Sequence, residues 1–418
     1  MRHKNRLPSY RHHKPSGQAV VTLSGQDIYL GPFNSEASRH ECDRVVAEWL
    51  AAGRTPASSD HENSPSVATL VNAFRKSEDY CTSHDHDYVA VWKLLVSLYG
   101  RTPARDFGPL ALKAVRQQMI EKGWNRNTIN RRVHIARRVF RWGVANEMLP
   151  AINIEALQAV EGLRYGRSAA PEPEAVEPVS IEHVEACLPF MPKMIQSMVK
   201  LQLYSGMRPG ELVIMKTEDL ETSAPTWRYR PSTHKTAYRG HRRDVVLGPK
   251  AQSILKPLLK TDLPAFIFSP AESEKQRREA IHISRKTPPA QGNEIGSNRV
   301  RAPRRSAGDC YDVAAYRYAI YRAADKAFPV PEDLSRLKGE REKAWRLRLG
   351  DRWCEVTRWR NEHRWHPHQL RHTFAHETRR QFGLEHTQSA LGHANAKMTE
   401  RYAQVAIEKA IEVATRTG

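Results

Sequence analysis

Apolar residues recur every three or four positions over long parts of the chain, a spacing typical of amphipathic helices. The clearest example is the segment 125–144, which we expect to open at Asn127 or Thr128. The residues on its apolar face are Ile129, Val133, Ala136, Val139 and Phe140. The same pattern predicts helices over 35–52, capped by Ser35, over most of 67–148, and over 181–189, 193–205 and 310–327.

Shorter runs alternate between apolar and polar residues, which indicates strands. Residues 19–33 predict two strands that turn at Ser24-Gly25, and residues 226–232 and 242–248 predict an antiparallel pair. The expected fold class is therefore mostly α with small antiparallel β-sheets.

Proline-rich and polar stretches divide the chain. Residues 163–179 contain three prolines among Glu and Ala and are typical of an extended linker. Residues 270–305 are polar and basic and predict a flexible loop, whereas 332–364 gives no clear assignment. The expected domains are 1–53, 65–162 and 180–418, with the linker 163–179 and an insertion at about 270–364.

The formal net charge of +20 and a pI of 9.9 favour a polyanionic partner, and nucleic acid first of all. Five scattered cysteines argue against a disulfide framework and a structural zinc, and no apolar run reaches membrane-spanning length. We therefore expect no membrane partner and a cytoplasmic protein, associated with the nucleoid if the source is prokaryotic. Candidate phosphate contacts are the helical Arg131, Arg132, Arg137, Arg138 and Arg141, and the ribbon residues Arg239, Arg242 and Arg243.

Several residues could cleave a phosphodiester without a metal or another cofactor. Arg208 and Arg371 both lie where a turn meets a helix, and their guanidinium groups could neutralise charge on the non-bridging oxygens. The phenol of Tyr402 could be the nucleophile, with His368 as base. His393 could donate to a phosphate oxygen, Lys235 could protonate the leaving oxygen, and Glu211 lies one turn after Arg208.

Each of these residues alone has an ordinary structural explanation, since a late tyrosine usually packs and a Gly-His pair often ends a helix. His368, His372 and His376 also fall at spacings of four and could instead line one helical face as metal ligands of a nuclease. No carboxylate pattern accompanies them. The combination of Arg208 and Glu211, His368 and Arg371, then His393 and Tyr402 is far more specific than any one of its members.

That combination resembles the tyrosine recombinase, or phage integrase, family. GMRPGEL supplies Arg208 and Glu211, THKT supplies the hairpin Lys235, HQLRHTFA supplies His368 and Arg371, LGH supplies His393 and TERY supplies Tyr402. Lys216 and Lys250 flank Lys235 and leave the choice of lysine open. The resemblance covers about 180–410 as catalytic domain, with 65–162 similar to the family's core-binding domain and 1–53, more weakly, to an arm-type DNA-binding domain.

The family implies cleavage of one strand to a 3′-phosphotyrosine and its rejoining to another strand, without metal or ATP. It also implies specific recombination sites on double-stranded DNA, a homotetramer in the synaptic complex, accessory DNA-bending proteins and an origin in a mobile genetic element. Two alternatives remain: a type IB topoisomerase-like enzyme that nicks and reseals, and an inactive DNA-binding protein of the same fold.

Overall fold

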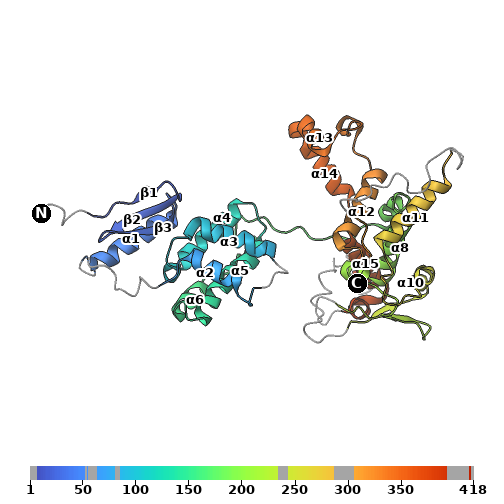
Figure 1. Ribbon diagram of the computed structural model, residues 1–418, viewed down its shortest axis with the longest axis horizontal. Helices are drawn as coiled ribbons and strands as arrows, with labels where there is room; N and C mark the ends of the chain where they lie inside the picture. Colours follow the sequence, from blue (N-terminus) through green and yellow to red (C-terminus); the bar gives the residue numbers. More distant parts are fainter. Residues whose placement is uncertain are drawn as a thin grey trace. The chain divides into compact units, whose positions relative to one another are not determined.

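The structure is a computed structural model that describes residues 7–51, 54, 64–80, 85–233, 243–286, 306–392 and 414–415. It divides into two compact units, Met1–Ala175 and Val176–Gly418 (Figure 1). We describe each unit by itself.

A small antiparallel sheet and one helix form the first part of unit 1. Strands β2 and β3 join through Ser24 and Gly25, which both have positive φ, as a two-residue hairpin turn requires. The hydroxyl of Ser35 accepts a hydrogen bond from the backbone N–H of Ser38 at 3.2 Å and so caps helix α1, as the sequence predicts. The sequence pattern missed the short strand β1. The elements are β1 (Arg11–His13), β2 (Gln18–Leu23), β3 (Gln26–Pro32) and α1 (Glu36–Ala51).

In the described residues from 64 to 158, five α-helices pack around one apolar core. The predicted apolar face of α5 is confirmed, because all five of its predicted members are buried. The helix is capped by Asn125, whose side chain accepts from the N–H of Thr128, so it starts earlier than expected. The helices are α2 (Val67–Lys76), α3 (Asp85–Tyr99), α4 (Pro109–Glu121), α5 (Arg126–Ala145) and α6 (Ala151–Gln158).

The proline-rich segment begins as part of unit 1. Ala170 is buried in the helical core, and the N–H of Arg126 donates to the carbonyl of Pro171 at 2.9 Å. The guanidinium of Arg126 also pairs with Glu172 at 2.8 Å. The segment up to Glu172 is therefore fixed to α5, and the division between the units falls after Ala175.

Helices around one core and a three-stranded antiparallel sheet form unit 2. Helix α15 packs against α8, and this pairing brings the two predicted arginine motifs together. Helix α15 is interrupted at Gly383, which has a positive φ. The helices are α7 (Ile181–Cys187), α8 (Lys193–Ser205), α9 (Pro209–Val213), α10 (Pro249–Leu255), α11 (Pro270–Ile283), α12 (Val313–Ala327), α13 (Glu342–Leu349), α14 (Trp353–His363) and α15 (Pro367–Leu391). The strands are β4 (Leu220–Glu221), β5 (Trp227–Tyr229) and β6 (Val245–Leu247).

One expectation needs correction in unit 2, and one segment that the sequence left unassigned gains a structure. Residues 270–283, expected in a loop, form helix α11, which Ser269 caps and in which Glu274 pairs with Arg277 and Arg278. The sequence of α11 is polar and shows little apolar periodicity, so the apolar pattern does not indicate a helix. The Ser269 and Glu272 pair, three residues apart, does mark a helix start. Residues 332–364 form α13 and α14, which share a small core of their own built from Leu334, Trp345, Leu349 and Val356. Residues 287–305 lie outside the described part.

Candidate active site

The loop between α8 and α9 carries the first predicted arginine. Gly206 ends α8 with φ of 61°, and a side chain there would collide with the ring of Phe374. Arg208 is the N-cap of α9, and Pro209 occupies the first helical position. Arg208 is thus fixed at a helix start, with its side chain 23% exposed.

Glu211, in the first turn of α9, orients Arg208 through two hydrogen bonds. One oxygen of its carboxylate accepts from the backbone N–H of Arg208 at 2.9 Å, and the other accepts from Nη1 at 2.7 Å. The carboxylate is 3% exposed. Burial alone would raise the pKa of Glu211, but Arg243 and Arg208 outweigh it and lower the pKa below its usual value. Glu211 is therefore ionised at neutral pH.

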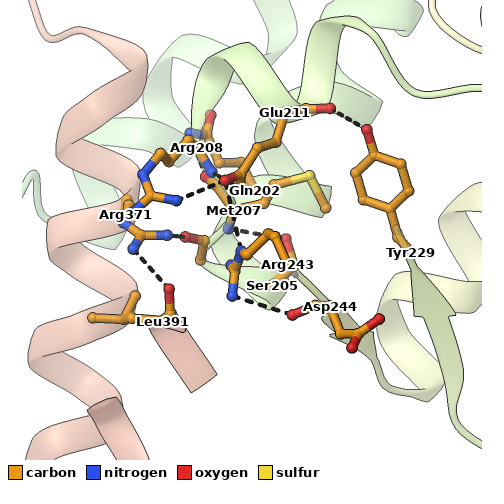
Figure 2. A network of polar contacts seen from close by, with 11 residues as sticks. Gln202, Ser205, Met207, Arg208, Glu211, Tyr229, Arg243, Asp244, Arg371 and Leu391 are labelled. Atoms are coloured by element: carbon orange, nitrogen blue, oxygen red, sulfur yellow. Dashed lines mark hydrogen bonds and ion pairs between the residues drawn. The ribbon is translucent and has the colours of Figure 1, made fainter. Parts of the chain in front are cut away.

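Arg371 is completely buried and joins two loops. Its Nη1 donates to the carbonyl of Gly206 at 2.6 Å, 165 positions away in the sequence, and its Nη2 donates to the carbonyl of Leu391 at 2.9 Å. Figure 2 shows these contacts beside Arg208. The structure thus brings Arg208, Glu211 and Arg371 together as the sequence motifs predict.

A third arginine, Arg243, belongs to the same cluster. Its Nε lies 3.6 Å from Glu211 Oε1, and its Nη1 donates to the carbonyl of Asp244 at 3.1 Å (Figure 2). The sequence pattern placed Arg243 among the DNA contacts of the ribbon, whereas the residue is 7% exposed and faces the interior. Burial lowers the pKa of Arg243, and Glu211 counteracts this shift.

The cluster has a net positive charge. Arg208 and Arg243 both face the carboxylate of Glu211, and Arg371 is hydrogen-bonded to the loop that carries Arg208. Among these four described residues, positive charges outnumber negative ones. Backbone contacts hold the frame rigid: the hydroxyl of Tyr229 donates to the carbonyl of Glu211 at 2.5 Å. Gln202 donates to the carbonyl of Met207 at 3.0 Å. Such a preorganised cationic site suits a phosphate oxygen whose charge grows during reaction.

Two histidines of α15 lie beside Arg371. The rings of His368 and His372 are 5.1 Å apart and edge to face. Burial, followed by His368, His366 and Arg371, lowers the pKa of His372 to about 4. His372 is therefore neutral at pH 7, and the sequence reasoning gave it no role beyond the metal alternative. Within the described residues, no group of three possible ligand side chains is arranged to hold a metal ion.

The remaining predicted catalytic residues, Lys235, His393 and Tyr402, lie outside the described residues, as do Arg239 and Arg242. The structure does show the turn that leads to His393: Leu391 ends α15 and Gly392 caps it with φ of 64°. The roles of Lys235, His393 and Tyr402 stay predictions.

The arginines of α5 have protein partners that the sequence pattern did not indicate. Arg132 is buried, pairs with Asp87 at 3.2 Å and lies 3.7 Å from the centre of the Trp124 ring, so its guanidinium is paired with protein groups in this structure. Arg131 also pairs with Asp87, and Arg137 donates to the carbonyl of Val160. Arg131, Arg138 and Arg141 are exposed and remain candidates for phosphate contact.

Comparisons with known proteins concern the family and the fold. Residues 342–409 match the model of the phage integrase family. The match begins inside the range expected to be an insertion and covers its last part, 342–364. No curated protein matches the sequence.

Solved structures show the same fold. A single-substitution variant of a Tn1549 transposon integrase fragment, in complex with transposon right end DNA, is 15% identical with a TM-score of 0.51 and covers 84% of this chain and 99% of its own. A lambda integrase dimer bound to a COC′ core site is 13% identical with a TM-score of 0.50 and covers 96% and 95%. The chain is thus similar to the phage integrase family over residues 342–409, and its fold is that of these integrases. In the described part of the chain, every helix is too short or too polar to cross a membrane.

Proposed function

We propose that this protein is a site-specific DNA recombinase or integrase that cleaves and rejoins strands through a covalent 3′-phosphotyrosine on Tyr402. The observation that carries the proposal is the hydrogen bond between Arg371 and the carbonyl of Gly206, which joins the second arginine motif to the loop where Glu211 holds Arg208.

The chemistry follows from the charges of that site. Arg208 and Arg371 bind the scissile phosphate and neutralise the charge that develops on its non-bridging oxygens. The phenol oxygen of Tyr402 attacks phosphorus, its proton passes to His368, and the bond from phosphorus to the 5′ oxygen breaks. Lys235 protonates that departing oxygen, and His393 donates to the phosphate. Bond energy is kept in the phosphotyrosine, so the rejoining step needs no ATP.

The proposed partners are double-stranded DNA with specific sites, three further copies of this chain in the synaptic complex, and accessory DNA-bending proteins. A mobile element is the proposed source. Residues 65–162 would act as a core-binding domain and residues 1–53 as an arm-type domain.

A suicide substrate tests the proposal. Nicked duplexes tiled across the DNA that flanks the gene should form a protein–DNA adduct that resists denaturant, because the short leaving strand diffuses away. Tyr402→Phe should abolish the adduct and keep non-covalent binding, since only the nucleophilic oxygen is lost. Tyr318→Phe, which changes an exposed tyrosine of α12, is the control and should form the adduct normally. An adduct with Tyr402→Phe at the wild-type level would contradict the proposal.

The two alternatives predict different results. A topoisomerase-like enzyme would relax a supercoiled plasmid that lacks the target site, whereas a recombinase should leave it supercoiled. An inactive DNA-binding protein would give no adduct with either the wild type or Tyr402→Phe. Adduct formation in excess EDTA would exclude the metal-dependent nuclease.

A further inference from the structure

Arg243 lies where the hairpin returns to strand β6, on the inward face of the sheet. Val245 and Leu247 are buried, whereas Val246 between them is 57% exposed. Since side chains alternate along a strand, Arg243 shares the buried face with Val245 and Leu247. This position aims a guanidinium away from solvent and toward Glu211.

One carboxylate oxygen of Glu211 serves two arginines. Its Oε1 accepts from Arg208 Nη1 at 2.7 Å and lies 3.6 Å from Arg243 Nε. Arg243 is the more buried of the two arginines, so its pairing with the carboxylate is screened less by solvent. Arg243 thus restrains the group that orients Arg208.

The same guanidinium lies against the turn before His393. A Cβ atom built on Gly392 would overlap Arg243 Nη1, so only glycine allows this approach. The positive φ of Gly392 favours glycine as well. Arg371 Nη2 donates to the carbonyl of Leu391, the preceding residue. Two arginines therefore support consecutive residues of this turn.

We propose that Arg243 is a positioning residue for strand cleavage. It holds Glu211, and through Glu211 also Arg208, at a fixed distance from the Leu391–Gly392 turn. The proposal rests on the proposed function. It differs from the sequence-based interpretation of Arg243 as a DNA contact, because the guanidinium of Arg243 faces Glu211 and the Gly392 turn.

The test measures single-turnover adduct formation and DNA affinity separately in the full-length chain. Arg243→Gln should slow adduct formation by about 10²-fold, the effect of a small misplacement of catalytic groups, and leave the dissociation constant for DNA unchanged. Arg243→Lys should recover part of the rate, because it returns a positive charge to Glu211 without the planar fork. Arg277→Gln, which removes an arginine paired with Glu274 on α11, is the control and should keep the wild-type rate.

Each of the following results would overturn the proposal. They are a wild-type rate with Arg243→Gln, a parallel loss of rate and affinity that marks a direct DNA contact, and no recovery with Arg243→Lys. An equal loss with Arg277→Gln would also overturn it, because the effect would then follow overall charge.

Gly392→Ala changes the other partner of the same contact, so it tests the proposal even if Arg243→Gln folds poorly. Gly392→Ala should slow adduct formation by displacing the guanidinium of Arg243. The double variant, Arg243→Gln with Gly392→Ala, should form the adduct no more slowly than the slower of the two single variants. Independent, multiplying losses would overturn the proposal. If the wild type forms no adduct, the proposed function fails; if it does and Arg243→Gln matches it, this inference alone fails.

Discussion

Glu211 is buried among arginines, and a buried carboxylate is stable only while its partners compensate for its lost hydration. Arg208 and Arg243 provide this compensation, and in return Glu211 keeps their cationic groups close together. The ion pair therefore determines the geometry of the site more than it adds to stability. Removing the charge of Glu211 therefore tests how far Arg208 and Arg243 depend on this carboxylate.

Glu211→Gln should lower the free energy of unfolding by about 3–5 kcal/mol, because it leaves the buried Arg243 without its countercharge. Calorimetry of the full chain measures the shift of the affected transition. Glu274→Gln on α11 is the matched control, since Glu274 also meets two arginines but at the surface. That change should cost at most about 1 kcal/mol. Equal losses in the two variants would contradict the role of burial.

His372 predicts a pH dependence. Its pKa is about 4 in the folded protein against 6.5 for an ordinary histidine. As the pH falls from 6.5 toward 4, the unfolded chain binds a proton that the folded chain does not, so stability is lost in this window. His372→Asn should reduce the fall of the thermal unfolding midpoint between pH 7 and pH 5. An unchanged fall would show that the burial of His372 has no such effect.

At the residue scale, the motifs predicted Arg208, Glu211 and Arg371 because their spacing is local to one turn or one helix. Arg132 and Arg243 were assigned to DNA contact because a run of basic residues gives no partners. The partners of Arg132 are Asp87 and Trp124, distant in sequence. For Arg243 the sequence did contain a signal. It lies two residues before Val245, and alternate residues along a strand point to the same face, so Arg243 is expected on the buried face.

At the scale of elements, the predictions succeeded where a periodic apolar face coincides with a capping residue. The apolar face of α5 and the turn from α8 to α9, with Gly206 as its end signal, are examples. The start of α5 was predicted less well, because Asn125 caps it rather than Asn127 or Thr128. Helix α11 was missed because its sequence is polar, and α13 and α14 because their small core is shared between them. The pairing of α8 with α15 is a contact between distant segments that helical periodicity cannot predict.

Gly206→Ala should destabilise the junction of α8 and α9. The positive φ costs about 1–3 kcal/mol for a non-glycine residue, and the new Cβ would overlap the Phe374 ring. Gly123→Ala is the matched control, because Gly123 also has a positive φ but has nothing within 4 Å of the Cβ position. Calorimetry should show a larger loss for Gly206→Ala. Equal losses would mean that the contact with Phe374 is relieved without cost.

At the scale of the whole molecule, a net charge of +20 predicts that DNA binding depends steeply on salt. Arg138→Gln removes an exposed basic side chain of α5 and should reduce the slope of log K against log salt by about 1. Arg132→Gln removes a buried one and should leave the slope unchanged while lowering the unfolding temperature. Binding titrations over a salt series measure both slopes. A reduced slope with Arg132→Gln alone would contradict this assignment of the arginines.

We propose above that the arginine cluster and Tyr402 act on one phosphate, although they come from distant parts of the chain. The most direct measurement is mass-spectrometric mapping of the residue that carries the nucleotide after suicide-substrate capture and proteolysis. We expect Tyr402 to carry a nucleotide joined through its 3′-phosphate, and Arg208→Gln or Arg371→Gln to reduce that peptide adduct strongly. A nucleotide on another residue, or an undiminished adduct in both arginine variants, would contradict it.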